Sequence, residues 1–190
     1  NYQDERFFLW IDSWDPHEPW DPPQYYVDLY DPGYEGEEVI YPWYGFSKDI
    51  MSEKELNHVK ALYAGEVTMV DRWLGRLFET IELTGLKENT LVMLMSDHGH
   101  YFGDHGLQGK PWGDLGQLYE PMAHLVMMIQ HPEAKPGRSS GLVQPVDFFP
   151  TVCELAGIEP PAGLQGHSFA VQLRGEGEGS RQYATTGRNL

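Results

Sequence analysis

The glycine-rich loop that follows the apolar run 90–95 holds the densest group of side chains that could do chemistry. Asp97 and His98 follow the run after a single serine, Ser96, and Gly99 lets the chain turn sharply after them. Open α/β sheets bind ligands at the carboxyl ends of their strands. A carboxylate and an imidazole there suit a divalent cation, and Lys110 could bring a positive charge to an anionic substrate. An Asx turn at Asp97, with His98 bonded to the backbone, would explain the same residues structurally.

The same loop contains a second histidine pattern, formed by His98, His100 and His105. Three histidines suggest zinc, but this spacing matches none of the common zinc ligand patterns. We therefore expect His100 to be an exposed loop residue. His105 is expected to support a neighbouring ligand through a hydrogen bond.

His17 lies in a second segment with chemical potential, Asp15-Pro-His-Glu-Pro-Trp20. Two prolines stiffen this loop, because each proline ring fixes its own φ angle. A rigidly held histidine beside a cation site could donate a hydrogen bond to a bound oxyanion or protonate a leaving group. The alternative is a structural histidine packed among Trp14, Trp20 and Tyr25.

The elements that must position these loops follow from the hydrophobic pattern. Residues 6–12 and 90–95 are short apolar runs of strand length, and a third run covers residues 124–129. Between the first run and the long helix, residues 13–50 contain six prolines, which indicates an ordered loop. A final strand is possible near residues 181–186. Apolar runs that alternate with a helix favour an α/β fold.

Two helices are predicted. Ser52 and Glu55 have the spacing of a capping box, and apolar residues then recur every three or four positions. This pattern predicts one long amphipathic helix over residues 53–83, with Gly85 as its stop. A shorter helix is predicted over residues 148–156.

Composition excludes several classes of function. The chain has 190 residues with 13 Lys and Arg against 29 Asp and Glu, a formal net charge of -16. Such an acidic chain is a poor partner for nucleic acid, whose binding depends on Lys and Arg. No apolar run approaches the roughly 20 residues of a membrane span. The single cysteine, Cys153, cannot form an intrachain disulfide and is expected to be a small core residue.

Several of these segments, in this order, resemble the sulfatase family of the alkaline phosphatase superfamily. The resemblance rests on the segment around His17, on Tyr63-Ala-Gly-Glu-Val-Thr-Met-Val-Asp71 and on Ser96-Asp-His-Gly99. It continues through Gly103-Asp-His-Gly106 to Lys110, then through Val146-Asp-Phe-Phe-Pro-Thr-Val152 and Leu155-Ala-Gly-Ile158 to Leu164-Gln-Gly166. These segments span nearly the whole chain.

This resemblance implies a metal-dependent hydrolase of sulfate esters, acting on a small-molecule or saccharide sulfate. It makes Asp97 and His98 ligands of the active-site cation, typically Ca²⁺, and places His17 and Lys110 on the sulfate oxygens. The fold implied is α/β and alkaline phosphatase-like, with a mainly parallel sheet flanked by helices. Residues 1–160 would be the carboxyl-terminal portion of the catalytic domain, and residues 161–190 the start of a smaller carboxyl-terminal region.

Two expected parts of the family pattern, the nucleophile and an acidic pair of cation ligands, do not occur in this sequence. The family's nucleophile lies in a Cys-x-Pro-x-Arg or Ser-x-Pro-x-Arg stretch and is oxidised to formylglycine, but Cys153 is followed by Glu-Leu-Ala. We therefore expect the nucleophile, and the acidic pair that completes the cation site, upstream of this chain. Two alternatives stay open: a phosphonate monoester hydrolase or phosphodiesterase of the same superfamily, and a segment that is inactive as it stands.

Overall fold

The computed structural model describes residues 5–111 and 118–186, which form two compact units. The first unit joins Asn1–Leu86 to Ser96–Leu125, and the second joins Lys87–Met95 to Val126–Leu190. The helices are α1 (Gln24–Val27), α2 (Ser47–Ile50), α3 (Glu53–Leu83), α4 (Glu120–Ala123), α5 (Phe148–Ala156) and α6 (Ala170–Leu173). The strands are β1 (Gly45–Phe46), β2 (Val92–Met95), β3 (Tyr101–Phe102), β4 (Leu107–Gly109) and β5 (Met127–Gln130). No helix in these ranges is both long and apolar enough to cross a membrane.

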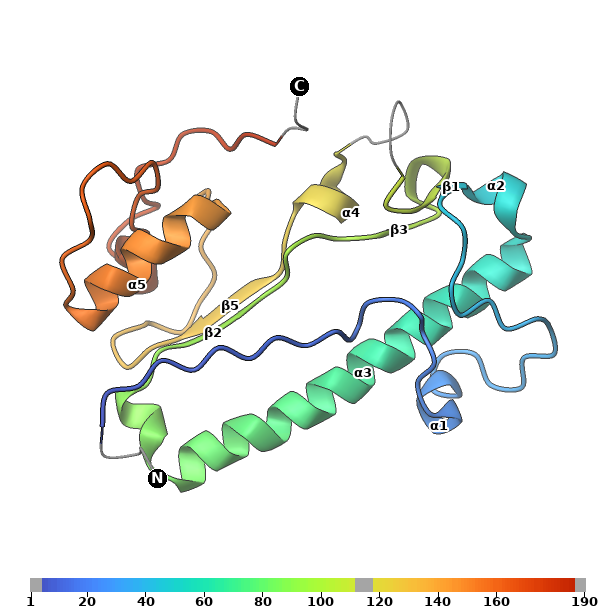
Figure 1. The fold of residues 1–190 in the computed structure, drawn as a ribbon, viewed down its shortest axis with the longest axis horizontal. Coiled ribbons are helices and arrows are strands. Elements are labelled where there is room, and N and C mark those ends of the chain that lie inside the picture. The colour runs from blue at the N-terminus through green and yellow to red at the C-terminus, as the bar shows by residue number, and fades with distance from the viewer. Residues whose placement is uncertain (1–4, 112–117, 187–190) are drawn as a thin grey trace. The chain divides into compact units, whose positions relative to one another are not determined.

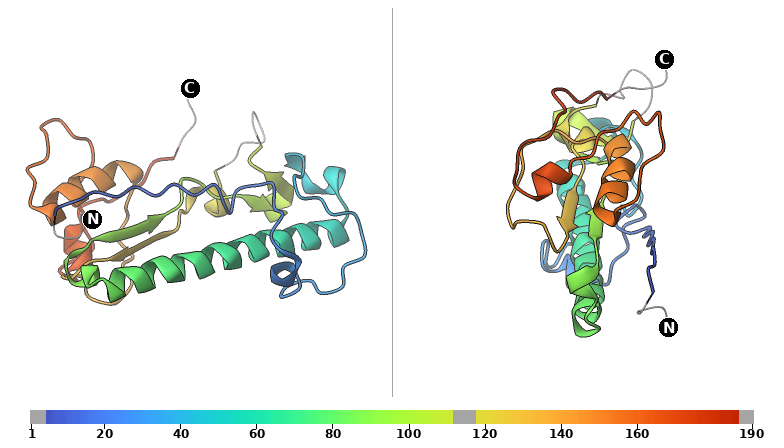
Figure 2. Two further views of the ribbon diagram at one scale, coloured as in Figure 1. Left: turned by 60° about the horizontal axis from the view of Figure 1, so that its bottom comes forward. Right: turned by 90° about the vertical axis from the view of Figure 1, so that its left-hand side faces the viewer.

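The long helix α3 confirms the helix predicted over residues 53–83 (Figures 1 and 2). Ser52 Oγ accepts a hydrogen bond from the Glu55 amide at 3.3 Å, and Glu55 Oε2 accepts one from the Ser52 amide at 2.7 Å. This capping box satisfies two amides that would otherwise be unpaired at the helix start. Gly85 follows the end of the helix with a φ of 74°, a conformation that favours glycine.

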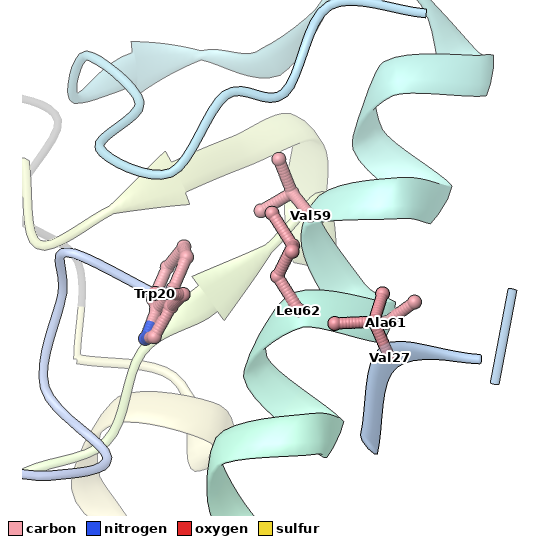
Figure 3. Close-up of a cluster of buried hydrophobic side chains, with 5 residues drawn as sticks. All are labelled: Trp20, Val27, Val59, Ala61 and Leu62. Carbon is pink, nitrogen blue, oxygen red and sulfur yellow. The ribbon is translucent and has the colours of Figure 1, made fainter. Parts of the chain in front are cut away.

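The core of the first unit lies against the amino-terminal half of α3, beside which α1 packs (Figure 1). Figure 3 shows its five buried side chains: Trp20, Val27, Val59, Ala61 and Leu62. Burying a side chain of this size contributes roughly 1.5–3 kcal/mol. Trp20 comes from the histidine-containing loop, so the core fixes that loop to the helix.

A small antiparallel sheet of order β1-β4-β3 completes the first unit. Tyr101 of β3 pairs with Gly109 of β4, and Phe46 of β1 pairs with Leu107. The loop predicted after residue 96 therefore contains a hairpin. The hairpin matters for function because Lys110 comes directly after β4.

The second unit contains the paired strands β2 and β5. It also contains the helices α5 and α6, which contact each other. Helix α5 confirms the predicted helix over residues 148–156, and Cys153 on it is buried as expected. Arg181 forms an ion pair with the buried Asp147. Burial raises the pKa of Asp147, but the hydrogen bonds from Arg181, His167 and Gln144 outweigh it and hold the pKa below its ordinary value. The predicted division of the chain at residue 160 stays a prediction.

Three sequence predictions differ from the structure. The run 6–12 is not a buried strand: no described strand pairs with it, and Phe7, Phe8, Leu9, Trp10 and Ile11 are exposed. Residues 181–186 also form no strand. The mainly parallel sheet is absent from the described residues, where every strand pairing is antiparallel. Parallel strands need a crossover connection that brings the chain back to the same end of the sheet. Here β5 instead runs opposite to β2, so that Val92 pairs with Gln130.

One buried carboxyl of the first unit gives a prediction about stability. Glu66 on α3 is 1% exposed; its Oε1 accepts a hydrogen bond from the Asp21 amide at 3.1 Å, and its Oε2 has no partner among the described residues. Burial, with the nearby charge of Asp15, raises the pKa of Glu66 from 4.5 to about 7. The folded state thus holds this proton more tightly than the unfolded chain, and stability falls as the pH rises from about 4.5 through about 7.

We expect Glu66→Gln to remove this loss. At pH 8 the variant should be more stable than the wild type by about 1–3 kcal/mol, because one pKa unit corresponds to about 1.4 kcal/mol. Near pH 3.5 the two should be nearly equal, since Glu66 is then largely protonated in both the folded and the unfolded state. Urea unfolding of the full-length protein at both pH values measures the difference, and parallel pH profiles would contradict the assignment.

Candidate active site

The loop that carries His17 is fixed to the core by Trp20. The Trp20 indole Nε1–H donates to the Pro16 carbonyl at 3.0 Å, and the Trp20 amide donates to Ile40 at 2.8 Å. His17 Nδ1 lies 2.7 Å from the Glu18 carbonyl oxygen. A carbonyl can only accept, so Nδ1 carries the proton and Nε2 presents its lone pair. His17 is 28% exposed and packs against Trp14 with ring centroids 4.4 Å apart, so its ring is held but accessible.

Lys110, which is distant in the sequence, contacts this histidine. Its Nζ lies 3.1 Å from His17 Nε2, although 93 residues separate the two. Behind it, Gly109 has a φ of 82°, and a Cβ there would lie 2.1 Å from Cδ1 of Tyr44. Only glycine therefore lets the Tyr44 ring pack at this point. The Lys110 ammonium lies over this ring, with Nζ 5.5 Å from the ring centroid. The structure thus brings together the two residues predicted to contact the substrate anion.

Glu18 is a third member of this group, and the sequence reasoning missed it. Its side chain is 1% exposed, and its two carboxylate oxygens accept hydrogen bonds from Lys110 Nζ at 2.8 and 3.0 Å. Tyr44 donates a further hydrogen bond from its hydroxyl. Burial alone would raise the pKa of Glu18, but the hydrogen bond from Lys110 and the charge of that residue hold it below its ordinary value. The only sequence signal was an acidic residue beside His17 in a loop fixed by prolines.

Asp97 and His98 form a compact pair after β2. Asp97 Oδ1 accepts a hydrogen bond from the His98 amide at 2.9 Å, the Asx contact that a purely structural role would also give. His98 Nδ1 donates to the Gly99 carbonyl at 2.9 Å, so its Nε2 carries the lone pair. This Nε2 lies 3.7 Å from Asp97 Oδ2. The His98 ring lies 6.3 Å from the His17 ring, which places both histidines in one group.

The donor atoms of this pair fit a divalent cation. A histidine that binds a metal through one nitrogen commonly donates its other N–H to a carbonyl, as His98 does. The Asp97 carboxylate is 88% exposed and has oxygen atoms of the kind that divalent cations bind. In the described ranges, no group of three or more His, Cys, Asp or Glu side chains could hold a metal. This chain's described residues thus offer two ligands from adjacent positions.

Gly99 holds this pair against α4. The Gly99 amide donates to Met122 at 3.0 Å, and the His100 amide donates to Pro121 at 3.1 Å. A Cβ at Gly99 would lie 1.9 Å from the Pro121 carbonyl oxygen, so no larger residue fits without moving the backbone. The glycine therefore fixes where Asp97 and His98 sit.

The other two histidines of the loop do not join His98 in a three-histidine site. His100 is mostly buried, with its side chain 9% exposed, contrary to the expectation of an exposed loop residue, and its Nε2 accepts a hydrogen bond from Gln108 at 3.2 Å. Burial lowers the pKa of His100 to about 4, although the charge of Glu18 acts in the opposite direction. His105 is exposed and its ring stacks on that of Tyr119, with centroids 3.7 Å apart; among the described residues no hydrogen bond joins it to Asp97 or His98.

The chain is similar to several known proteins. The family model described as Sulfatase matches residues 1–158. The N-acetylglucosamine-6-O-sulfatase of Bacteroides thetaiotaomicron is 36% identical over 118 residues, covering 61% of this chain and 20% of the relative. The chain spans between 20% and 36% of the length of the first curated relatives it matches.

Solved structures of related proteins resemble the chain as well. The structure of BT4656 in complex with its substrate D-Glucosamine-2-N, 6-O-disulfate has a TM-score of 0.60 and 30% identity, covering 72% of this chain and 28% of that one. The phosphonate monoester hydrolase SpPMH from Silicibacter pomeroyi has a TM-score of 0.59 and 27% identity, covering 70% of this chain and 25% of that one.

Proposed function

This chain belongs to the sulfatase family, and we propose that it takes part in the hydrolysis of sulfate esters. His17 and Lys110 would act on the ester, and Asp97 and His98 would be ligands of a divalent cation. The observation that supports this most directly is the contact of Lys110 Nζ with His17 Nε2 at 3.1 Å, with the His98 ring 6.3 Å from His17.

Lys110 and His17 would both act on the leaving group of the ester. Lys110 places a positive charge where the nonbridging sulfate oxygens and the leaving oxygen develop negative charge. Its N–H···Nε2 contact with His17 also holds a proton between the two side chains. When the ester bond breaks, the leaving alkoxide needs a proton, and it can come from Lys110 directly or from His17 after Lys110 has passed that proton to Nε2. His17 keeps its orientation because Nδ1–H is bonded to the Glu18 carbonyl.

A bound divalent cation would polarise the sulfate oxygens as a Lewis acid. We propose Ca²⁺, because the Asp97 carboxylate is a hard oxygen ligand. The His98 imidazole also suits transition metals, so Mn²⁺ and Zn²⁺ belong in any metal titration. The nucleophile, expected to be formylglycine, is not assigned to any residue of this chain.

We propose a sulfated saccharide as substrate. The relative from Bacteroides thetaiotaomicron is named for N-acetylglucosamine-6-O-sulfate chemistry, and BT4656 was solved with a sulfated glucosamine. The similarity to a phosphonate monoester hydrolase supports a second candidate, hydrolysis of phosphonate monoesters or phosphodiesters, because Lys110, His17 and a cation suit either anion.

Side-by-side kinetics on the full-length protein decide between these substrates. The panel is glucosamine 6-sulfate, an aryl sulfate, an aryl phosphodiester and an aryl phosphonate monoester. We expect kcat/KM to be at least about 100-fold higher for a sulfate, since the site would bind that transition state better. A preference for the phosphonate would favour the second candidate. Turnover of none of the four would favour an inactive protein.

A further inference from the structure

Glu18 is a buried acid in a place that should favour neutral side chains. It is 1% exposed, and an unpaired carboxylate there would be costly. Lys110 Nζ compensates with hydrogen bonds to both carboxylate oxygens, at 2.8 and 3.0 Å. The Tyr44 hydroxyl donates to the same carboxylate. Glu18 is thus the common acceptor of hydrogen bonds from two separate segments of the chain.

The contacts of Lys110 show what this arrangement does. An ammonium has three N–H donors, and those of Lys110 are directed at the two Glu18 oxygens and at His17 Nε2. A lysine side chain has four rotatable bonds, so without such partners its charge would sample many positions. The carboxylate restricts the ammonium to one position beside the His17 nitrogen, and the Lys110 side chain as a whole is 17% exposed.

A second set of neighbours lies beside the carboxylate. Gln108 is fully buried, and its Nε2–H donates to His100 Nε2, which directs the His100 Nδ1–H toward Glu18 Oε2 at 3.8 Å. Glu18 also sets His17 through its backbone, because the Glu18 carbonyl accepts the His17 Nδ1–H. One residue therefore orients both of the side chains that we propose act on the ester.

We propose that Glu18 is a positioning residue whose buried carboxylate holds the Lys110 ammonium in the place where it meets the sulfate group. This inference rests on the proposed function, since it assumes that Lys110 acts on the substrate. Glu18 acts through Lys110 and does not touch the ester. Its removal should therefore lower kcat and leave substrate binding by the rest of the site nearly intact.

The first experiment measures kcat, KM and the melting temperature of Glu18→Gln in the full-length protein on the sulfate ester that the wild type hydrolyses best. We expect kcat to fall about 100-fold, because a displacement of about 1 Å in a catalytic group costs that much. KM should change by less than about threefold. Glu18→Asp, which keeps the charge, should recover part of the rate. The matched control is Glu66→Gln, the other fully buried glutamate of this unit, which should keep kcat within about twofold of the wild type.

A double-mutant cycle tests whether Glu18 acts through Lys110. In the Lys110→Met background, Glu18→Gln should cause no further loss of kcat, since the group it positions is gone. Tyr44→Phe is a second probe that keeps every charge and removes one hydrogen bond to the carboxylate. It should lower kcat by about 3- to 10-fold, and it keeps the test usable if Glu18→Gln does not fold.

Two results would overturn the inference: wild-type kcat in both Glu18→Gln and Tyr44→Phe, or a Glu18→Gln loss that is equally large with and without Lys110. Failure of the proposed function is separate, because it would be seen as a wild-type protein that hydrolyses no sulfate ester. It would also be seen as a Lys110→Met variant with the wild-type rate.

Discussion

Lys110→Met is expected to lower kcat for sulfate ester hydrolysis by about 100- to 1,000-fold, the usual effect of removing one donor that stabilises transition-state charge. Methionine keeps most of the apolar stem of the lysine and removes the ammonium. No other cation contacts His17 among the hydrogen bonds and ion pairs of the described residues. Because the chain carries a net charge of -16, the surrounding field cannot replace that charge for an anionic substrate.

The stability of the same variant separates catalysis from folding. Lys110→Met leaves the buried Glu18 carboxylate without its ion pair, which should cost about 3–5 kcal/mol in unfolding experiments. Adding Glu18→Gln removes the unpaired charge and should restore most of that stability. If Lys110 acts on the substrate, the double variant regains stability but not kcat. Recovery of both would show that the lysine only supports the fold.

The control for this experiment is a lysine with a defined contact outside the site. Lys54 is exposed on α3 and donates to the Glu35 carbonyl at 2.9 Å. Lys54→Met removes the same charge from the same unit, and we expect kcat within about twofold of the wild type. A wild-type rate in Lys110→Met, measured in parallel by initial rates, would exclude Lys110 from the reaction.

The helices were predictable because their signals are local. The Ser52 and Glu55 pair and the repeat of apolar residues lie within the segment they describe, and α3 has the predicted bounds. The prediction of a strand over residues 6–12 was wrong because burial depends on contacts outside the segment. Apolar residues of strand length become buried only if another strand or helix covers them, and sequence periodicity contains no information about that partner.

In the site, too, local features were predictable and contacts between distant segments were not. Family resemblance pointed to His17, Asp97, His98 and Lys110 one by one, but not to their arrangement. The contact between Lys110 and His17 spans 93 residues and depends on the hairpin of β3 and β4. Glu18 was missed because an acid in a proline-rich, acidic segment resembles a solvated surface residue. Only the packing of Tyr44 and Lys110 around it shows that it is buried.

Asp97→Asn is expected to lower the affinity for Ca²⁺ by at least about 100-fold, since a direct ligand should cost no less than the supporting residues that typically cost 10- to 100-fold. Asparagine keeps the side-chain oxygen that accepts the His98 amide, so the Asx contact and the local backbone should persist. The change removes the negative charge alone. This distinguishes a cation ligand from a residue that only shapes the turn, because a turn residue would tolerate asparagine.

Calorimetric titration of the metal-stripped full-length protein with Ca²⁺, Mn²⁺ and Zn²⁺ measures the effect. Asp104→Asn is the matched control, because Asp104 is exposed in the same loop and its carboxylate accepts a backbone hydrogen bond from Phe102 at 3.0 Å. That variant should bind the cation with wild-type affinity. If Asp97→Asn also binds each of the three ions as tightly as the wild type, Asp97 is not a ligand. Asp97 and His98 would then have only the structural role of an Asx turn.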